Sequence, residues 1–312
     1  MRFSIYQESR KGGRRVNQDR MGYLYTRESL LMMVADGMGG HARGEIAAET
    51  MVQVLATRYP AEARPKLANP ARFLKDAVEA AHHELHRYRA ERALPEAPRT
   101  TLVACIVQDG MATWAHVGDS RLYLVREGRI AARTLDHSRV HHLVAAGLIR
   151  PEDAKDHPER NRIYNCIGAN VPPQVDVARP VRLRRGDTVL LCTDGLWGVL
   201  PDERLASAFG PAGVMRVVPE LIGLALHEGG PESDNCTAVA MTWAGEESID
   251  MIPPSEGPVS TLMIPEGAVS STIQMRFPGD DVPDTEFTED RIDEAVAEIQ
   301  RAIQRSSKLI SR

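Results

Sequence analysis

Apolar residues follow two spacings in the larger, N-terminal part of the chain. Short apolar and aromatic runs, typical of strands, occupy residues 3–8, 21–25 and 30–35. A longer segment at 45–59 repeats apolar residues every three or four positions, as an amphipathic helix does, and Pro60 is expected to end it. The chain is therefore predicted to begin with three strands and a helix.

A second helix is expected after Asn69-Pro70, because asparagine caps helix starts and proline suits the first helical position. Strand-like runs return further along the chain, at 101–107, 112–117, 121–125, 188–192 and 236–243, and a further helix is expected over 219–227. Two groups of antiparallel strands, with two long helices between them in the chain, predict an α+β fold built in layers.

The pattern changes near residue 245. From there to Arg312 the chain has 14 acidic and 6 basic residues and is rich in Pro and Ser. Only near the end do Ile292, Val296, Ile299 and Ile303 recur at helical spacing. We therefore expect a folded domain over 1–244 and an acidic, low-complexity tail over 245–312 that ends in a short amphipathic helix.

Composition excludes several classes of protein. The formal charge is −5, and after subtraction of the tail the first 244 residues carry only +3, too little to indicate nucleic-acid binding. No apolar run approaches the roughly 18–20 residues of a membrane span, and the first residues lack the apolar stretch of a signal peptide. Four widely spaced cysteines predict buried free thiols in a reducing cytoplasm.

Candidate chemistry lies in five aspartates that adjoin predicted strands. They are Asp19, Asp36, Asp119, Asp194 and Asp234. Each alone is an ordinary turn residue. Together they indicate a shared site, because a carboxylate at the end of a buried strand is costly unless its charge is compensated. Oxygen-only ligands suit Mg²⁺ or Mn²⁺, and no His/Cys spacing typical of zinc competes.

The glycines after Asp36 fit such a site. Residues without Cβ in Asp36-Gly37-Met38-Gly39-Gly40 allow the backbone to approach a metal or a phosphate. No Gly-Lys-Ser/Thr follows, so this is not a nucleotide-binding P-loop.

Seven short motifs, in this order, resemble the metal-dependent protein phosphatases, the type 2C serine/threonine phosphatases, in their bacterial form. They are Arg14-x-x-Asn17-Gln18-Asp19, Asp36-Gly37-Met38-Gly39-Gly40-His41, Gly118-Asp119-Ser120-Arg121, Asp136-His137-Ser138, His157-Pro158-x-Arg160-Asn161, Thr193-Asp194-Gly195-Leu196 and Ser233-Asp234-Asn235-Cys236-Thr237. The resemblance covers about residues 1–244. It implies a four-layer α-β-β-α sandwich, in which helices flank two antiparallel sheets.

The resemblance also implies roles for single residues. Asp36 would bridge two divalent cations, Mn²⁺ or Mg²⁺, with the Gly37 carbonyl on one of them. The other cation would be held by Asp194 and Asp234, and a third by Asp119 with Asp194. Asp19, Gln18 and Asn235 would lie behind these ligands, and Arg14 would bind the substrate phosphate.

Two positions depart from part of the family. Gln18 stands where many members have glutamate, which lowers the negative charge near one cation. Met38 stands where eukaryotic members have a histidine proposed as general acid. The motif therefore leaves the identity of the proton donor open, with His41 as a weak candidate.

The expected function is hydrolysis of phosphoserine and phosphothreonine in proteins by a metal-activated water, which would reverse a cognate Ser/Thr kinase. Two cations lower the pKa of a shared water enough for it to attack phosphorus near neutral pH. The alternatives are a catalytically weak module that binds phosphoproteins and a hydrolase of small phosphate esters. Expected partners are phosphorylated proteins and a kinase, with no nucleic acid and no membrane span.

Overall fold

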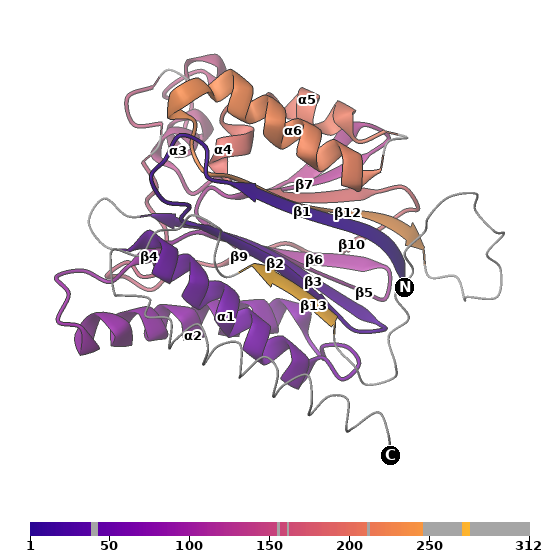
Figure 1. Cartoon of the computed structure of the whole chain (residues 1–312), viewed down its shortest axis with the longest axis horizontal. Helices are drawn as coiled ribbons and strands as arrows, with labels where there is room; N and C mark the ends of the chain where they lie inside the picture. The colour runs from indigo at the N-terminus through magenta and orange to yellow at the C-terminus, as the bar shows by residue number, and fades with distance from the viewer. Residues whose placement is uncertain (39–42, 155–156, 161, 211–212, 246–269, 275–312) are drawn as a thin grey trace, which may run out of the picture. The chain divides into compact units, whose positions relative to one another are not determined.

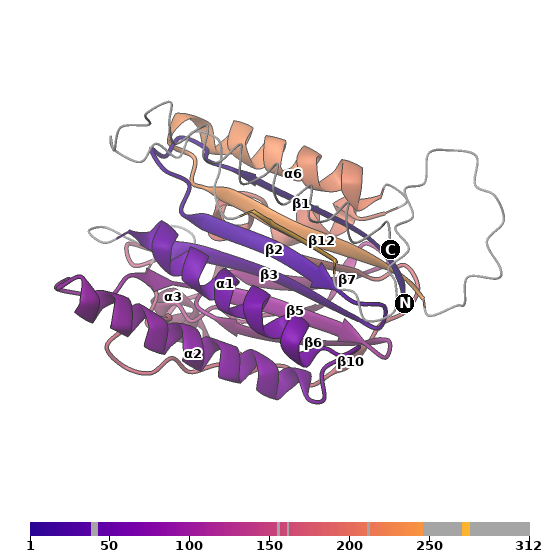
Figure 2. The same cartoon turned by 60° about the horizontal axis from the view of Figure 1, so that its bottom comes forward.

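Two antiparallel sheets packed face to face form the centre of the protein (Figure 1). The computed structural model describes residues 1–38, 43–154, 157–160, 162–210, 213–245 and 270–274. Helices cover the outer face of each sheet, which gives four layers (Figures 1 and 2). The predicted α+β sandwich is confirmed.

The first sheet has the strand order β1-β12-β11-β7-β8. Its strands are β1 (Arg2–Arg10), β12 (Cys236–Gly245), β11 (Thr188–Cys192), β7 (Arg121–Arg126) and β8 (Arg129–Arg133). The two ends of the predicted domain therefore meet, because β1 pairs with β12 along its whole length.

The second sheet has the order β10-β6-β5-β3-β2-β13. Its strands are β10 (Val181–Arg182), β6 (Met111–Val117), β5 (Leu102–Gln108), β3 (Ser29–Met38), β2 (Asp19–Tyr25) and β13 (Ser270–Gln274). Two short strands lie off this path, β4 (Arg99–Thr100) beside β3 and β9 (Asp176–Val177) beside β6.

Long helices α1 (Gly44–Glu62) and α2 (Pro70–Glu91) cover the second sheet. The first sheet is covered by α4 (Asp194–Trp197), α5 (Asp202–Ala208) and α6 (Val214–Gly229). Shorter connecting elements are α3 (Arg139–Ala145) and the 3-10 turns Pro151–Ala154 and Gly230–Glu232. Within the described residues, no helix is both long and apolar enough to cross a bilayer.

Three apolar clusters fill the spaces between the layers. One lies between α1, α2 and the second sheet and includes Met51 and Leu85, and another lies under α6 and includes Leu221. The third joins the two sheets through residues such as Met32 and Leu191. All four cysteines are buried and free, as predicted.

Neither proline predicted as a helix boundary marks one. Helix α1 runs past Pro60 to Glu62, because a proline in the last turn removes only one backbone hydrogen bond. Helix α6 starts at Val214, not at Pro219, because its buried apolar face begins there. The N-cap of α2 is as expected, since the Asn69 side chain accepts a hydrogen bond from Arg72 N–H.

The strand β13 comes from beyond residue 245, where the composition changes. Its residues pair with β2, from Ser270 opposite Tyr25 to Gln274 opposite Met21. The first compact unit accordingly extends from Met1 to Phe277. The proposed limits of 1–244 and 245–312 stay a prediction, and the expected helix around Ile292 to Ile303 lies outside the described residues.

Candidate metal centre

Asp19 begins β2 and stands directly opposite Asp36 of β3. Its side chain is fully buried, and one oxygen, Oδ2, accepts hydrogen bonds from the hydroxyls of Thr193 (2.9 Å) and Thr237 (2.6 Å). The other oxygen, Oδ1, is buried without a hydrogen-bond partner. Asp19 therefore lies between both sheets, because Thr193 follows β11 and Thr237 belongs to β12.

The position of Asp36 is fixed through its backbone. Its carbonyl oxygen accepts hydrogen bonds from the Thr100 hydroxyl (2.8 Å) and the Thr101 N–H (2.9 Å), while its own N–H donates to the Thr101 hydroxyl (3.1 Å). These bonds use only the backbone of Asp36 and leave its carboxylate to interact with other groups.

Gly37 lies against the first residue of helix α1. A Cβ on Gly37 would lie 2.2 Å from the Gly44 carbonyl oxygen, and a Cβ on Gly44 would lie 2.4 Å from the Gly37 carbonyl oxygen. Such distances exclude any side chain at either position without movement of the backbone. The Gly37 N–H donates to the Gln18 carbonyl (3.2 Å), which joins this turn to the segment before β2.

Gln18 and Asn235 tie three segments together. The Gln18 N–H donates to Asn235 Oδ1 (2.8 Å), and the Gln18 side-chain amide donates to Glu45 of α1 (3.1 Å). Asn235 Nδ2 donates to the carbonyls of Lys11 (2.8 Å) and Val16 (3.1 Å). Both residues therefore shape the loop that carries Arg14.

Asp119 is reached through a tight turn at Gly118, where φ is +101° and a Cβ would lie 2.6 Å from Thr101 Cγ2. The Asp119 side chain is buried, and its Oδ1 has no hydrogen-bond partner. The next residue, Ser120, shares a 2.7 Å hydrogen bond with the Thr101 hydroxyl. Thr101 thus contacts both the Asp36 turn and the Asp119 turn.

Asp194 and Asp234 lie on the side of the first sheet. Asp194 is the first residue of α4, and Gly195 packs so closely that a Cβ there would lie 2.0 Å from the Asn235 carbonyl oxygen. Asp234 accepts a 2.6 Å hydrogen bond from the Arg14 guanidinium, whose side chain is 57% exposed. Arg14 therefore lies at the solvent-exposed rim of the acidic group.

The pKa values of four of the five aspartates are raised. Burial raises the pKa of Asp19 to about 7, and the charges of Asp194 and Asp234 act in the same direction. Burial and the charge of Asp234 raise the pKa of Asp194 to about 6. The pKa values of Asp36 and Asp119 are raised well above the usual range, first by burial and then by the neighbouring carboxylates.

These residues fit divalent cations. Buried carboxylate oxygens without hydrogen-bond donors, at Asp19 and Asp119, are the groups that a cation or its water would satisfy. Among the described residues, three ligand atoms within 4.8 Å of one another occur only at His116, His137 and Asp176. The aspartates are spaced more widely, which suits several hydrated cations better than one bare ion.

A buried ion pair supports the Asp119 side of the site. Arg121 donates two hydrogen bonds to Asp136, at 2.8 and 2.7 Å, and its guanidinium lies 3.5 Å from the centre of the Trp197 ring. Two of the sequence motifs therefore contact each other directly. Arg121 also contacts Asp202, which begins α5.

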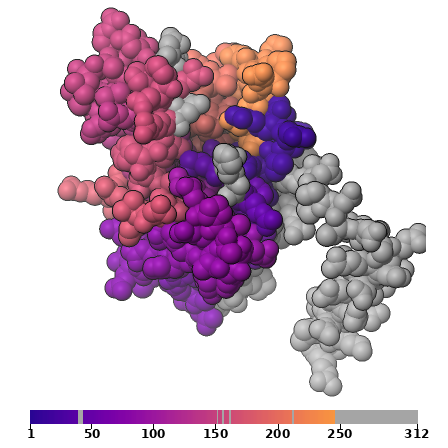
Figure 3. Space-filling model, turned by 90° about the vertical axis from the view of Figure 1, so that its left-hand side faces the viewer, coloured from indigo at the N-terminus to yellow at the C-terminus, as the bar shows by residue number. Residues whose placement is uncertain are grey.

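The structure brings together nine of the ten residues singled out from the sequence. They are Arg14, Gln18, Asp19, Asp36, Gly37, Asp119, Asp194, Asp234 and Asn235. His41 lies outside the described residues. In Figure 3, indigo, purple, pink and orange surfaces adjoin on one side of the molecule, which shows how distant segments meet there.

Four threonines were missed by the sequence reasoning: Thr100, Thr101, Thr193 and Thr237. Thr193 and Thr237 lie within the quoted motifs, one residue before Asp194 and three residues after Asp234. A hydroxyl so close in sequence to a candidate carboxylate is a usable signal for a hydrogen-bond donor to the site. Thr100 and Thr101 carry no such signal, because their contact with Asp36 arises only from the pairing of β3 with β4.

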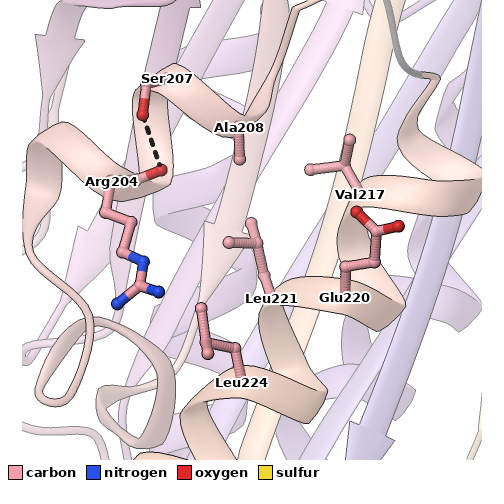
Figure 4. Close-up of a pocket in the computed structure, with 7 residues that line it drawn as sticks. All are labelled: Arg204, Ser207, Ala208, Val217, Glu220, Leu221 and Leu224. Carbon is pink, nitrogen blue, oxygen red and sulfur yellow. Dashed lines mark hydrogen bonds between the residues drawn. The ribbon is translucent and has the colours of Figure 1, made fainter.

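A pocket of about 260 Å³ lies elsewhere, between α5 and α6. Figure 4 shows Val217, Leu221 and Leu224 on its apolar side, with Arg204 and Glu220 at the rim. None of the aspartates lines this pocket, so it is separate from the candidate centre.

Comparison with known proteins identifies the family of this chain and supports its fold. The sequence profile of the protein phosphatase 2C family matches residues 7–220. The chain belongs to this family. The serine/threonine phosphatase stp of Listeria monocytogenes is 32% identical to it over 191 residues, which are 61% of this chain and 75% of stp.

Solved structures of the family have the same fold. The serine/threonine phosphatase of S. agalactiae matches with a TM-score of 0.69 and 30% identity, over 77% of this chain and 99% of that one. The catalytic domain of the phosphatase PstP, in complex with two manganese ions, matches with a TM-score of 0.66 and 32% identity, over 78% and 99%. The resemblance predicted from the motifs is confirmed.

Proposed function

We propose that this phosphatase hydrolyses phosphoserine and phosphothreonine in proteins, with divalent cations held by the five aspartates. The observation that carries the proposal is the convergence of Asp19, Asp36, Asp119, Asp194 and Asp234 from separate segments. Burial and the neighbouring carboxylates raise the pKa values of the first four. Such a group of carboxylates opposes folding unless positive charge is bound.

We assign the ligands as the family resemblance implies. Asp36 would contact two cations and the Gly37 carbonyl one of them, Asp194 and Asp234 the other, and Asp119 with Asp194 a third. When bound, Mn²⁺ or Mg²⁺ supplies the charge that lowers the pKa of water and offsets the charge of the phosphate. Asp19, held by Thr193 and Thr237, would accept hydrogen bonds from water next to the cations.

Arg14 would bind and orient the phosphate. A guanidinium has five N–H donors, more than its hydrogen bond to Asp234 uses, and its planar shape suits two phosphate oxygens. Its exposure at the rim allows a protein substrate to reach it. Met38, at the end of β3, cannot donate a proton to the leaving group, so His41 stays a proposed donor.

Partners and location follow from this chemistry. The substrates would be phosphorylated proteins, and the reaction would reverse a Ser/Thr kinase. The four buried thiols, all free, suit a reducing cytoplasm. The relative PstP crystallised with manganese, which favours Mn²⁺ as the first cation to test.

The test is hydrolysis of a phosphothreonine peptide and a phosphoserine peptide, with Mn²⁺, with Mg²⁺ and with EDTA. A panel of phosphorylated metabolites is measured in parallel. Release of phosphate from the peptides that requires the cation supports the proposal. Faster hydrolysis of a metabolite would favour the small-ester hydrolase, and cation-dependent binding of the peptides without turnover would favour the binding module.

A further inference from the structure

His137 is a buried histidine that joins the Asp119 turn to the segment before β9. Its side chain is 6% exposed. On the backbone, the His137 N–H donates to the Gly118 carbonyl (2.9 Å). On the side chain, Nδ1 accepts a hydrogen bond from the Gly118 N–H (3.1 Å). Gly118 is therefore held by both of its backbone groups.

The hydrogen-bond partners of the imidazole determine which ring nitrogen carries the proton. Besides the Gly118 N–H, Nδ1 accepts from the side-chain amide of Asn165 (2.8 Å). The orientation of that amide is fixed, because its Nδ2 also donates to the Gln174 carbonyl (2.7 Å) and its Oδ1 accepts from the Gln174 N–H (3.1 Å). Two N–H donors on Nδ1 require a lone pair there, so the ring proton sits on Nε2, which faces Asp176 at 3.3 Å.

Gly118 has little freedom of its own. Its φ of +101° places it in the left-handed region, and the Thr101 side chain packs where its Cβ would be, at 2.6 Å. The residue that follows is Asp119, whose buried Oδ1 has no hydrogen-bond partner. The orientation of the carboxylate therefore depends on how the Gly118 turn is held.

We propose that His137 is a positioning residue, whose Nδ1 holds the Gly118 N–H and thereby orients Asp119 toward the candidate metal centre. The hydrogen bond from Gly118 to His137 does not depend on the proposed function. Only its expected effect on cation binding rests on the proposed function. A neutral imidazole that holds the backbone next to a ligand acts like the outer-shell partners of other metal sites.

A metal ion on His137 is the competing interpretation, because ligand atoms of His116, His137 and Asp176 lie within 4.8 Å of one another. The N–H groups that donate to His137 Nδ1 argue against a metal ion on Nε2. A metal on Nε2 of a neutral His137 would require the proton on Nδ1, where the Gly118 and Asn165 N–H groups already point. His116 uses Nε2 to donate to the Leu135 carbonyl (2.8 Å), and the two rings stack at 4.6 Å.

The direct test is NMR of the ¹⁵N-labelled full-length protein. A through-hydrogen-bond coupling between the Gly118 amide nitrogen and His137 Nδ1, with Nδ1 unprotonated, is expected with and without Mg²⁺. Absence of this coupling, or a protonated Nδ1, would overturn the proposal. This measurement needs no enzymatic activity, so its failure can be distinguished from a failure of the proposed function.

Two variants of His137 distinguish the role of Nδ1 from the role of Nε2. In His137→Asn, the amide oxygen replaces Nδ1 as acceptor, whereas in His137→Gln the amide lies near the position of Nε2 and the Nδ1 acceptor is lost. Asp176→Asn is the control that changes the Nε2 contact and leaves the Nδ1 acceptor in place. The Oδ1 of Asp176, which accepts a long hydrogen bond from the Gln174 side chain (3.4 Å), keeps an acceptor in the Asn variant. We expect His137→Gln to lower cation affinity or turnover by about 10–100-fold, and His137→Asn and Asp176→Asn to keep most of both.

Cation affinity is measured by calorimetry and turnover on the phosphothreonine peptide, with circular dichroism as the check on folding. Equal losses in the Asn and Gln variants would show that packing, not the Nδ1 acceptor, matters. One tightly bound equivalent of Zn²⁺ that is lost in both His137→Gln and Asp176→Asn would establish the competing metal site and overturn the proposal.

Discussion

Asp19 and Asp36 stand directly opposite each other on neighbouring antiparallel strands. Like charges in this position destabilise a strand pair, and burial increases the cost. The charges of Asp194 and Asp234 also act on both residues. The acidic centre therefore reduces the stability of the cation-free fold, and bound cations are expected to restore it.

The first prediction is that the cation-free protein becomes more stable as the pH falls from 8 to 5. The folded-state pKa values of Asp19 (about 7) and Asp194 (about 6) exceed those of the unfolded chain. The folded state consequently takes up protons first, and the gain is lost as the pH rises through these values. Each group changes the free energy of unfolding by at most about 1.4 kcal/mol per pH unit.

The measurement is thermal unfolding in EDTA between pH 5 and pH 9. Asp19→Asn should flatten the profile, because the amide keeps the shape of the side chain without a titrating charge. Saturating Mg²⁺ should raise the melting temperature most at high pH, where the carboxylates are ionised. A cation-free profile that rises toward pH 8 would contradict the prediction.

The second prediction concerns Asp36 and Asp194. Asp36→Ala and Asp194→Ala should each lower cation-dependent turnover by at least about 100-fold, because a lost ligand removes several kcal/mol of charge stabilisation. Their cation-free forms should melt at or above the wild-type temperature, since one buried like charge is gone. Asp76→Ala, on the surface of α2, is the matched control. Near wild-type turnover in Asp36→Ala or Asp194→Ala would contradict the assignment of that residue as a cation ligand.

The third prediction concerns Arg14. Arg14→Ala should lower kcat/KM for phosphopeptides by about 10–150-fold, because one charge-assisted contact contributes about 1.5–3 kcal/mol. Cation affinity, followed by calorimetry, should change little. Arg15→Ala is the control, since Arg15 is an exposed neighbour of the same charge. If the two variants exchange behaviour, Arg15 is the residue that binds phosphate.

The fourth prediction concerns the ion pair behind Asp119. Arg121→Met should lower the free energy of unfolding by about 3–5 kcal/mol, because Asp136 is 8% exposed and would be left charged without its partner. Adding Asp136→Asn should recover part of this loss. Urea unfolding of the single and double variants measures the coupling. Arg216→Met, which breaks an exposed pair with Glu220, should cost less than about 1 kcal/mol.

The fifth prediction concerns the segment after residue 245. A chain ending at Gly245 should keep cation-dependent hydrolysis of a small substrate, because every candidate ligand precedes β12. It should melt at a lower temperature than a chain ending at Phe277, because only the longer one keeps β13 beside β2. We further expect the residues after 245 to affect recruitment of a protein partner.

Phosphatase assays, thermal unfolding and binding of a purified phosphoprotein compare the two truncations with the full chain. Equal melting temperatures would show that β13 adds nothing to stability. Joint loss of stability and small-substrate turnover in the shorter chain would show that the segment belongs to the catalytic domain, against the prediction.

Local sequence was enough to predict most of the strands and the two long helices. Period-two and period-3.6 spacing depends on neighbouring residues only, so β2, β3, β5, β6, β7 and β11 lie close to their predicted ranges. The ends of the helices were harder. The sequence predicts boundaries at Pro60 and Pro219, but burial of apolar faces in α1 and α6 outweighs one lost hydrogen bond.

The sequence by itself determined which carboxylates are the candidates that the fold brings together, because each of these aspartates adjoins an apolar strand and a glycine or polar turn. Only the tertiary structure decided how they are held. Thr193 and Thr237 reach Asp19 because β11 and β12 are neighbours, and His137 reaches Gly118 across a separation that no spacing rule connects. The physical reason is that motifs report local chain geometry, whereas hydrogen-bond partners far apart in sequence are set by the pairing and packing of the sheets.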